Sequence, residues 1–241
     1  MNPPRTDEDG TADGRVAIVT GASRGLGLEL TKRLVAGGWS VVVDARHGGE
    51  LAEAVAGLGP RVRAVPGDVT DPVHRERLVA AARELGALEL LVNNASTLGP
   101  TPLPGLAHYP LPALREVIET NVLAPLALVQ ACLPALEAAG GAVVNVTSDA
   151  AVEGYAGWGG YGASKAALEQ LSRVLAAEQP RVRVYWVDPG DMNTRMQQDA
   201  YPGEDVSDRP PPSASVPGIL RLVDERPPSG RYLARAEEVP G

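Results

Sequence analysis

Residues 16–27 read VAIVTGASRGLG, an apolar run that leads into Gly21, Gly25 and Gly27 and then into a helix-like stretch. This order predicts a buried parallel strand, a tight turn and a helix N-terminus. In such a unit Gly21 permits the turn, Gly25 lets the backbone approach a pyrophosphate, and Gly27 allows close packing of helix and strand. The free N–H groups at the helix N-terminus then hold the anion. The spacing G-x-x-x-G-x-G differs from the general dinucleotide fingerprint G-x-G-x-x-G, so that motif is not met.

Short valine-rich segments alternate with helical patterns along the rest of the chain. Strands are expected near residues 15–20, 40–45, 61–65, 88–93, 141–147 and 181–187, with a short helix near 214–225 and a last strand near 230–235. Such alternation predicts an α/β fold, a doubly wound parallel sheet of the Rossmann type in three layers. We expect a disordered tail over residues 1–13 and one domain over 14–241, with a proline-rich substrate loop near 197–213.

Composition restricts the classes of function. A chain of 241 residues with 44% hydrophobic residues is long enough for one α/β domain. Its net charge of −8 argues against nucleic acid as a partner. The single cysteine, Cys132, excludes an intramolecular disulfide, and the polar N-terminus contains no secretory signal or membrane span, so we expect a cytoplasmic protein. No Cys/His cluster has metal-ligand spacing, and His47, His74 and His108 are expected at the surface.

A second stretch, NVTSDAAVEGYAGWGGYGASKAAL, places Tyr161 four residues before Lys165 and thirteen after Ser148. If the residues from Gly160 onward form a helix, Tyr161 and Lys165 lie on one face of it. An ammonium near a phenol favours the phenolate, so we expect a lowered pKa for Tyr161 and a role as general acid or base. Ser148, at the end of a strand, would hold a substrate oxygen beside the phenol. Tyr-x-x-x-Lys alone is a weak pattern, and it gains weight from the glycine-rich segment.

With both segments in view, the chain resembles the short-chain dehydrogenase/reductase family, in its branch of single-domain enzymes. The resemblance runs from about Arg15 to Thr194. Four further segments occur in the order of that family: GDVTD around Asp68, LVNNAS at 91–96, ETNVLAP around Asn121, and DPGDMNTRM at 188–196. Two features depart from the family pattern. Ser96 replaces a glycine, and PPSGRYLARAEE stands where relatives carry a glycine-rich C-terminal signature.

The resemblance implies hydride transfer between a nicotinamide and a carbonyl/alcohol pair. Tyr161 would protonate the forming alkoxide, Ser148 would bind the substrate oxygen, and Lys165 would lower the pKa of Tyr161 and bind the nicotinamide ribose. Asn121 would anchor an ordered water, completing the expected catalytic set of Asn121, Ser148, Tyr161 and Lys165. The expected cofactor-binding residues are Gly21, Ser23, Arg24, Gly25, Leu26, Gly27, Arg46, Asp68, Val69, Asn94, Ala95, Tyr161, Lys165, Pro189, Gly190 and Thr194.

The end of the second expected strand, WSVVVDARHGG, bears on the choice of cofactor. Asp44 is a candidate for the ribose 2′-OH of NAD, but the family register places that acid at Ala45. Alternation along the strand turns Asp44 and Ala45 to opposite faces. Arg46 and Arg24 stand where NADP-using relatives carry an arginine, and two guanidiniums can bracket a 2′-phosphate. NADP(H) is therefore favoured, NAD(H) stays open, and solvent-exposed arginines are the alternative reading.

Asn121 also has a local reason to matter. Pro125 lies four residues later and has no N–H for the carbonyl of Asn121, which would leave that carbonyl free for a water. A helix kink without further function is the alternative.

The predicted function is that of an NADP(H)-dependent oxidoreductase acting on a small-molecule carbonyl or alcohol. Tyr155, Trp158, Asp191 and Met192 are expected in the substrate pocket. Two alternatives stay open: an NADP(H)-binding sensor or assembly subunit without turnover, and a non-redox dehydratase or epimerase with Tyr161 as base. The family resemblance also implies a homodimer or homotetramer formed by two long helices near 111–138 and 160–178.

Overall fold

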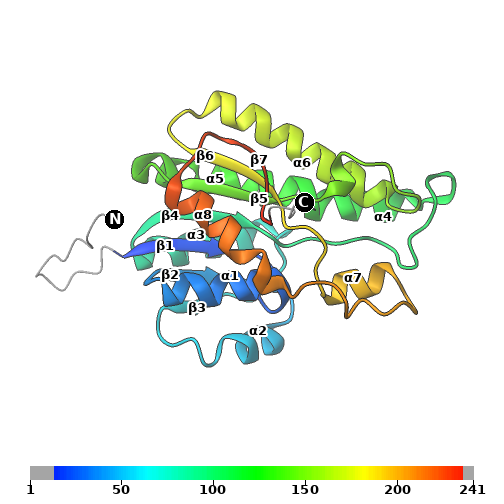
Figure 1. Ribbon diagram of the computed structural model, residues 1–241. Helices are drawn as coiled ribbons and strands as arrows, with labels where there is room; N and C mark the ends of the chain where they lie inside the picture. Colours follow the sequence, from blue (N-terminus) through cyan, green and yellow to red (C-terminus); the bar gives the residue numbers. More distant parts are fainter. Residues whose placement is uncertain (1–13, 236–241) are drawn as a thin grey trace, which may run out of the picture.

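The valine-rich segments form one parallel sheet at the centre of the molecule. The computed structural model describes residues 14–235, so the predicted disordered tail lies outside the described residues. All expected strands are present, and the sheet order is β3-β2-β1-β4-β5-β6-β7 (Figure 1). The strands are β1 (Arg15–Val19), β2 (Ser40–Val43), β3 (Val62–Ala64), β4 (Ala87–Asn93), β5 (Ala142–Val146), β6 (Arg183–Asp188) and β7 (Gly230–Leu233).

Helices cover both faces of the sheet, which gives the predicted three layers of a Rossmann-type domain (Figure 1). The helices are α1 (Gly25–Ala36), α2 (Gly48–Val55), α3 (Pro72–Leu85), α4 (Leu111–Ile118), α5 (Ala124–Ala139), α6 (Gly159–Glu178), α7 (Arg195–Ala200) and α8 (Val216–Glu225). Along β1, Ala17 and Val19 pack in the layer of α1 and α8, whereas Val16 and Ile18 pack in the layer of α3 and α5. This alternation explains why the strand is apolar at every position after Arg15.

The predicted helix near 111–138 is divided by a wider turn. Between α4 and α5 lies a π turn, η2 (Glu119–Leu123), in which the N–H of Ala124 bonds to the carbonyl of Glu119. Taken as one helix, Leu111–Ala139 is long and apolar enough to cross a membrane by composition, a test that core helices of soluble proteins also pass. Here Leu128, Cys132 and Leu136 are fully buried in the layer beneath the sheet.

Two expectations differ from the structure. The segment near 197–213 begins as a helix, because the side chain of Thr194 caps α7 by accepting the N–H of Gln197 at 3.2 Å, and the irregular loop starts only at Tyr201. His74 is not at the surface. Its side chain is 1% exposed because it lies on the inner face of α3, where Nε2 is 3.0 Å from the carboxylate of Asp44.

Candidate active site

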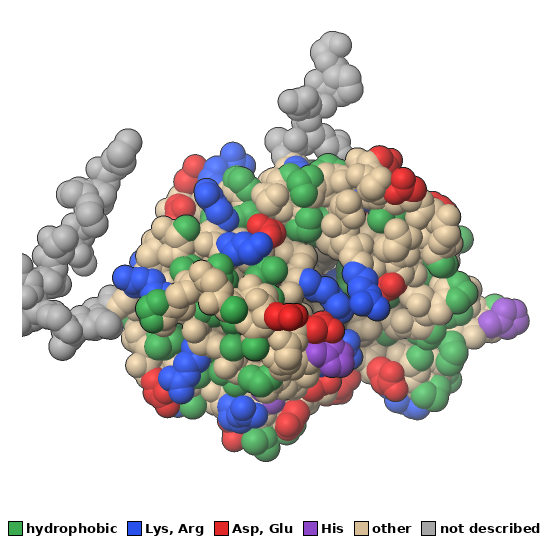
Figure 2. Space-filling view, turned by 90° about the horizontal axis from the view of Figure 1, so that it is seen from below, with side chains coloured by type: hydrophobic (Ala, Val, Ile, Leu, Met, Phe, Trp, Pro, Cys, Tyr) green, Lys and Arg blue, Asp and Glu red, His purple; other side chains and the backbone are tan. Residues whose placement is uncertain are grey.

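A cavity of about 740 Å³ opens at the carboxyl ends of the central strands, next to the neighbouring strands β1 and β4, where the strand order reverses. This is the place at which open α/β sheets bind ligands. Figure 2 shows the face of the molecule on which Lys, Arg and acidic side chains gather around a hollow. The predicted residues that line the cavity are Gly21, Ser23, Arg24, Gly25, Leu26, Arg46, Asp68, Val69, Asn94, Ala95, Tyr161, Lys165, Pro189, Met192 and Thr194.

The glycine-rich loop has the geometry that its sequence predicts. Gly21 has a φ of +68°, and a Cβ there would lie 2.9 Å from the Cα of Ala95. Gly25 has a φ of +57°, and a Cβ there would make only an ordinary contact with Thr194 at 3.7 Å, so the left-handed backbone is what requires glycine there. A Cβ on Gly27 would lie 2.5 Å from the carbonyl oxygen of Gly21, which shows the close helix-to-strand contact. Gly27 therefore supports the loop from behind and does not line the cavity.

Two side chains, buried Asp44 and partly buried Asn94, hold this loop in place. The carboxylate of Asp44 accepts the backbone N–H of Gly21 at 2.7 Å, and its other oxygen meets His74. Asp44 is 1% exposed, and burial raises its pKa although His74 and Gly21 act in the opposite direction. The amide of Asn94 donates to the carbonyls of Thr20 and Gly21. Asp44 and Asn94 thus set the shape of the loop.

Two arginines line the cavity near the end of β2, each close to a carboxylate. Arg24 lies directly before α1, with Nη1 3.6 Å from the carboxylate of Glu50. Arg46 follows β2 and acts on Asp68: burial would raise the pKa of Asp68, but hydrogen bonds from Thr70 and the charge of Arg46 lower it. Both arginines line the cavity, as predicted.

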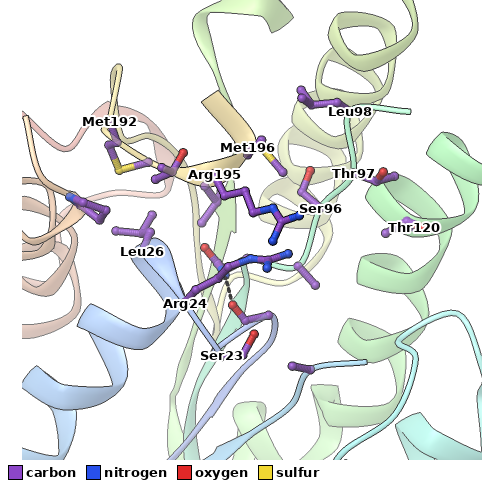
Figure 3. A pocket seen from close by; sticks show the side chains of 18 of the residues that line it. Ser23, Arg24, Leu26, Ser96, Thr97, Leu98, Thr120, Met192, Arg195 and Met196 are labelled. Carbon is purple, nitrogen blue, oxygen red and sulfur yellow. Dashed lines mark hydrogen bonds between the residues drawn. The ribbon is translucent and has the colours of Figure 1, made fainter. Parts of the chain in front are cut away.

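Arg195 is a cavity residue that the sequence analysis missed. It begins α7 and extends into the cavity from the side opposite Arg24, so that the two guanidiniums approach the same space (Figure 3). Its position directly after Thr194 was a signal, because Thr194 already belonged to the predicted cofactor site.

The residues of this cavity fit a nicotinamide dinucleotide. The first turn of α1 carries no acidic residue, and its preceding residue, Arg24, makes no side-chain cap. The N–H groups of that turn are therefore available to an anion, next to the left-handed Gly25. The residues that would hold the dinucleotide are the glycine loop, Arg24 and Arg46. Within residues 14–235 no group of three His, Cys, Asp or Glu side chains is arranged to bind a metal ion.

Tyr161 and Lys165 line this cavity, and Ser148 lies next to the phenol of Tyr161. Tyr161 and Lys165 are on α6, as predicted, and both are nearly fully buried. The ammonium of Lys165 donates to the carbonyl of Val146 at 2.8 Å and lies 5.4 Å from the centre of the Tyr161 ring. Ser148 follows β5, and its hydroxyl donates to the carboxylate of Asp149 at 2.8 Å.

The expected lowering of the Tyr161 pKa is not found in this structure. Burial raises the pKa of Tyr161 well above its ordinary value, and the charges of Asp188 and Asp149 raise it further. Hydroxyls of Ser148 and Ser96 act in the opposite direction. Lys165 does not offset these effects, because its ammonium is turned toward the Val146 carbonyl and burial lowers its own pKa to about 8. Tyr161 is therefore held in its protonated form.

Asn121 lies behind the cavity in the π turn and is fully buried. Its side-chain oxygen accepts the hydroxyl of Ser96 at 3.1 Å and the N–H of Thr97 at 2.9 Å. Its amide donates to the carbonyl of Thr97 and to the hydroxyl of Ser164 on α6. Asn121 thus ties the loop after β4 to the helix of Tyr161. Ser96, first noted only as a departure from the family pattern, connects Asn121 with Tyr161.

A second cavity of about 260 Å³ adjoins the first, and Tyr161 lines both. All four predicted substrate-pocket residues, Tyr155, Trp158, Asp191 and Met192, line it, together with Ser148 and Gly190. The ring of Trp158 meets Tyr161 edge to face at 5.6 Å and lies 5.9 Å from Tyr201. Tyr155 closes the rim by donating its hydroxyl to Asp149 at 3.0 Å.

Comparisons with known proteins agree with this geometry. The family described as short chain dehydrogenase matches residues 15–205. Sepiapterin reductase from Mus musculus is 37% identical over 199 residues, which cover 76% of each chain. A solved short-chain dehydrogenase from Pseudomonas syringae is 32% identical with a TM-score of 0.85, covering 96% of this chain and 100% of the other. Another from Escherichia coli CFT073, complexed with NADPH, is 29% identical with a TM-score of 0.85, covering 92% and 97%.

Proposed function

This chain belongs to the short-chain dehydrogenase family and is an oxidoreductase, and we propose that it reduces the carbonyl group of a small molecule with NADPH, or oxidises the corresponding alcohol. One observation carries the proposal. Tyr161 stands in the wall shared by two adjoining cavities, one with the features of a dinucleotide site and one lined by aromatic side chains. A proton donor at this junction can reach a substrate oxygen from the smaller cavity.

The contacts of Asp44 favour NADP(H) over NAD(H). Both carboxylate oxygens of Asp44 are engaged, one by Gly21 and one by His74, so Asp44 is not free to accept a ribose hydroxyl. Arg24 and Arg46 at the same end of the cavity provide the positive charge that a 2′-phosphate needs. The NADPH bound in the related Escherichia coli structure supports the same choice.

The bound nicotinamide would supply or accept the hydride, and the protein side chains would position the substrate and move the proton. Tyr161, whose pKa burial raises, would donate its proton to the substrate oxygen. Ser148 would turn its hydroxyl from Asp149 to that oxygen. Lys165 would hold the nicotinamide ribose in the larger cavity, which it lines. Asn121 would keep Tyr161 in place by joining the loop that carries Ser96 to α6, and it would anchor an ordered water.

The smaller cavity favours an uncharged substrate with an apolar or aromatic part. Its lining combines the rings of Tyr155, Trp158 and Tyr201 with methionines. The charged side chains among the lining residues are the carboxylates of Asp149, Asp188 and Asp191, and no Lys, Arg or His is among them. Asp188 is paired with Arg231 and Asp191 lies 3.9 Å from Arg209, whereas Asp149 has no salt bridge among the described residues. An anionic substrate would meet the like charge of Asp149 there, which costs binding energy. We further propose a cytoplasmic homo-oligomer that binds neither nucleic acid nor membranes.

The test is a panel of ketones and aldehydes assayed with NADPH by the loss of nicotinamide absorbance, with products identified. Methyl benzoylformate and the benzoylformate anion form a matched pair that differs in charge. We expect turnover of the ester and a much lower kcat/KM for the anion. NADPH binding without consumption across the panel would favour the non-catalytic alternative, and a product formed without nicotinamide oxidation would favour a dehydratase or epimerase.

A further inference from the structure

Arg231 on the last strand reaches the back of the catalytic centre. Its Nε donates to a carboxylate oxygen of Glu169 at 2.9 Å. Its Nη2 donates to the carboxylate of Asp188 at 3.1 Å and to the backbone carbonyl of Ser148 at 3.3 Å. One guanidinium from β7 therefore joins α6, the end of β6 and the segment that carries Ser148.

The two carboxylates depend on this cation. Glu169 is 1% exposed and Asp188 5% exposed, so neither charge is well solvated by water. Burial works against the charge of Arg231, yet the hydrogen bond with Glu169 and the charge of Asp188 raise the pKa of Arg231 above its ordinary value. Glu169 has a second cation, Arg173, at 2.9 Å from its other oxygen. Among the salt bridges of the described residues, Asp188 pairs only with Arg231.

Asp188 is also the charged neighbour with the largest effect on Tyr161. The groups that face the phenol are Lys165 from its own helix, Asp188 from β6, Ser148 and Asp149 from the segment after β5, and Ser96 from the loop after β4. The electrostatic potential around an ion pair falls off faster with distance than the potential around a lone carboxylate. Arg231 thereby limits the repulsion between Asp188 and a Tyr161 phenolate.

We propose that Arg231 is a positioning residue of the catalytic centre, which holds Ser148 through its backbone carbonyl and compensates the Asp188 carboxylate that faces Tyr161. This inference rests on the proposed carbonyl/alcohol activity. It assigns a role to the C-terminal segment, which the sequence alone marked only as unlike its relatives.

Arg231→Met removes the charge and the hydrogen bonds while keeping an unbranched side chain. With Asp188 uncompensated, the Tyr161 phenolate is less favoured, and a rise of one pKa unit reduces the ionised fraction about tenfold. We expect kcat/KM for alcohol oxidation at pH 8 to fall about tenfold or more, and the rise of its pH profile to move to higher pH. Arg231 bonds to none of the residues proposed to bind the cofactor, so the Kd for NADPH should change less than about threefold.

Arg173→Met is the matched control, because it removes a guanidinium from Glu169 without touching Asp188 or Ser148. We expect its pH profile to match that of the wild type.

Arg231→Lys should keep the wild-type pH profile, since an ammonium still compensates Asp188. It should lower kcat, because an ammonium lacks the planar set of N–H donors with which the guanidinium bonds to both Ser148 and Glu169. The double variant Asp188→Asn/Arg231→Met removes both charges and should restore the profile. Thermal melting monitored by circular dichroism shows which variants fold.

The outcomes separate the two proposals. If wild type and Arg173→Met both fail to turn over any carbonyl of the panel, the proposed function and this inference fail together. If the wild type is active and Arg231→Met follows Arg173→Met in its profile, only the role of Arg231 is wrong. The role of Arg231 is also contradicted if adding Asp188→Asn does not restore the pH profile of Arg231→Met, or if Arg231→Lys shifts the profile as much as Arg231→Met does. If Arg231→Met does not fold, Arg231→Lys and the double variant test the role of Arg231 instead. The readouts are the same, the pH profile of alcohol oxidation and the Kd for NADPH.

Discussion

The carboxylate of Asp44 accepts the backbone N–H of Gly21 at 2.7 Å, across 23 residues of sequence. An acid at the end of the second strand of a dinucleotide-binding domain often meets the ribose of NAD. Here the same residue type is turned inward, shapes the glycine loop and pairs with buried His74. Arg46, and not an acid, is therefore the side chain after β2 that is available to the cofactor ribose. The first prediction follows from this arrangement.

Replacing Arg46 by Ala should weaken NADPH binding by about ten- to a hundredfold and leave NADH binding nearly unchanged. Charge-assisted hydrogen bonds contribute about 1.5–3 kcal/mol, and only NADPH offers a phosphate to pair with. Titration of nicotinamide fluorescence gives both dissociation constants. Arg63→Ala is the control, because Arg63 pairs with Glu84 on the surface away from the cavity. Equal losses for the two cofactors would contradict the assignment.

Tyr161→Phe should reduce kcat by about 10²- to 10⁴-fold, the usual contribution of general acid catalysis. The ring and its edge-to-face contact with Trp158 remain, so folding and NADPH affinity should be preserved. Kinetics with the best ketone of the panel, together with a fluorescence titration, check both parts. Near-normal turnover by the variant would show that another group donates the proton.

The two reaction directions should differ in their dependence on pH. The pKa of Tyr161 is raised, so the phenol stays protonated through neutral and moderately alkaline pH. Reduction needs the protonated phenol and should not lose rate through Tyr161 between about pH 6 and 9. Oxidation needs the phenolate, so kcat/KM for the alcohol should rise about tenfold per pH unit over that range. A plateau of the oxidation rate near neutral pH would mean that the pKa of Tyr161 is low in the working enzyme.

Lys165→Met should lower catalysis but raise stability at neutral pH. Burial lowers the pKa of Lys165 from 10.5 to about 8, so below pH 8 the folded protein carries a poorly solvated charge. Removing that charge should stabilise the fold by about 2 kcal/mol after the lost hydrogen bond to Val146 is subtracted. Between pH 8 and 10.5 the unfolded chain binds a proton that the folded chain has released, so the stability of the wild type rises with pH. Urea unfolding at several pH values should show that the difference in unfolding free energy between Lys165→Met and the wild type becomes smaller from pH 8 to 10.5.

Apolar side chains on the two long helices support the proposed self-association. Leu111 is 64% exposed on α4, and Val174 is 44% exposed on α6. We expect a dimer or tetramer at micromolar concentration in analytical ultracentrifugation, and its dissociation by Val174→Asp. Val73→Asp on α3 is the matched control, because Val73 is 60% exposed on another helix. A monomeric wild type would refute the prediction.

Local patterns in the sequence were enough to predict the sheet, the glycine loop and the Tyr161–Lys165 pair. Strand alternation, left-handed glycines and the four-residue spacing on a helix are properties of neighbouring residues, so they can be read along the chain. The same strand alternation predicted that Asp44 and Ala45 point to opposite faces, but it did not indicate which of the two faces the glycine loop.

The electrostatic state of the site was decided only by the tertiary structure. Lys165 is four residues from Tyr161, which predicted a lowered tyrosine pKa, but burial and the distant residues Asp188 and Asp149 raise it. His74 is buried because Asp44, 30 residues earlier, meets it inside the fold. Arg231 reaches Ser148 across 83 residues, and Asn121 reaches Ser164 across 43. Desolvation and charge depend on which segments fold against each other, and a linear pattern carries no record of those distances.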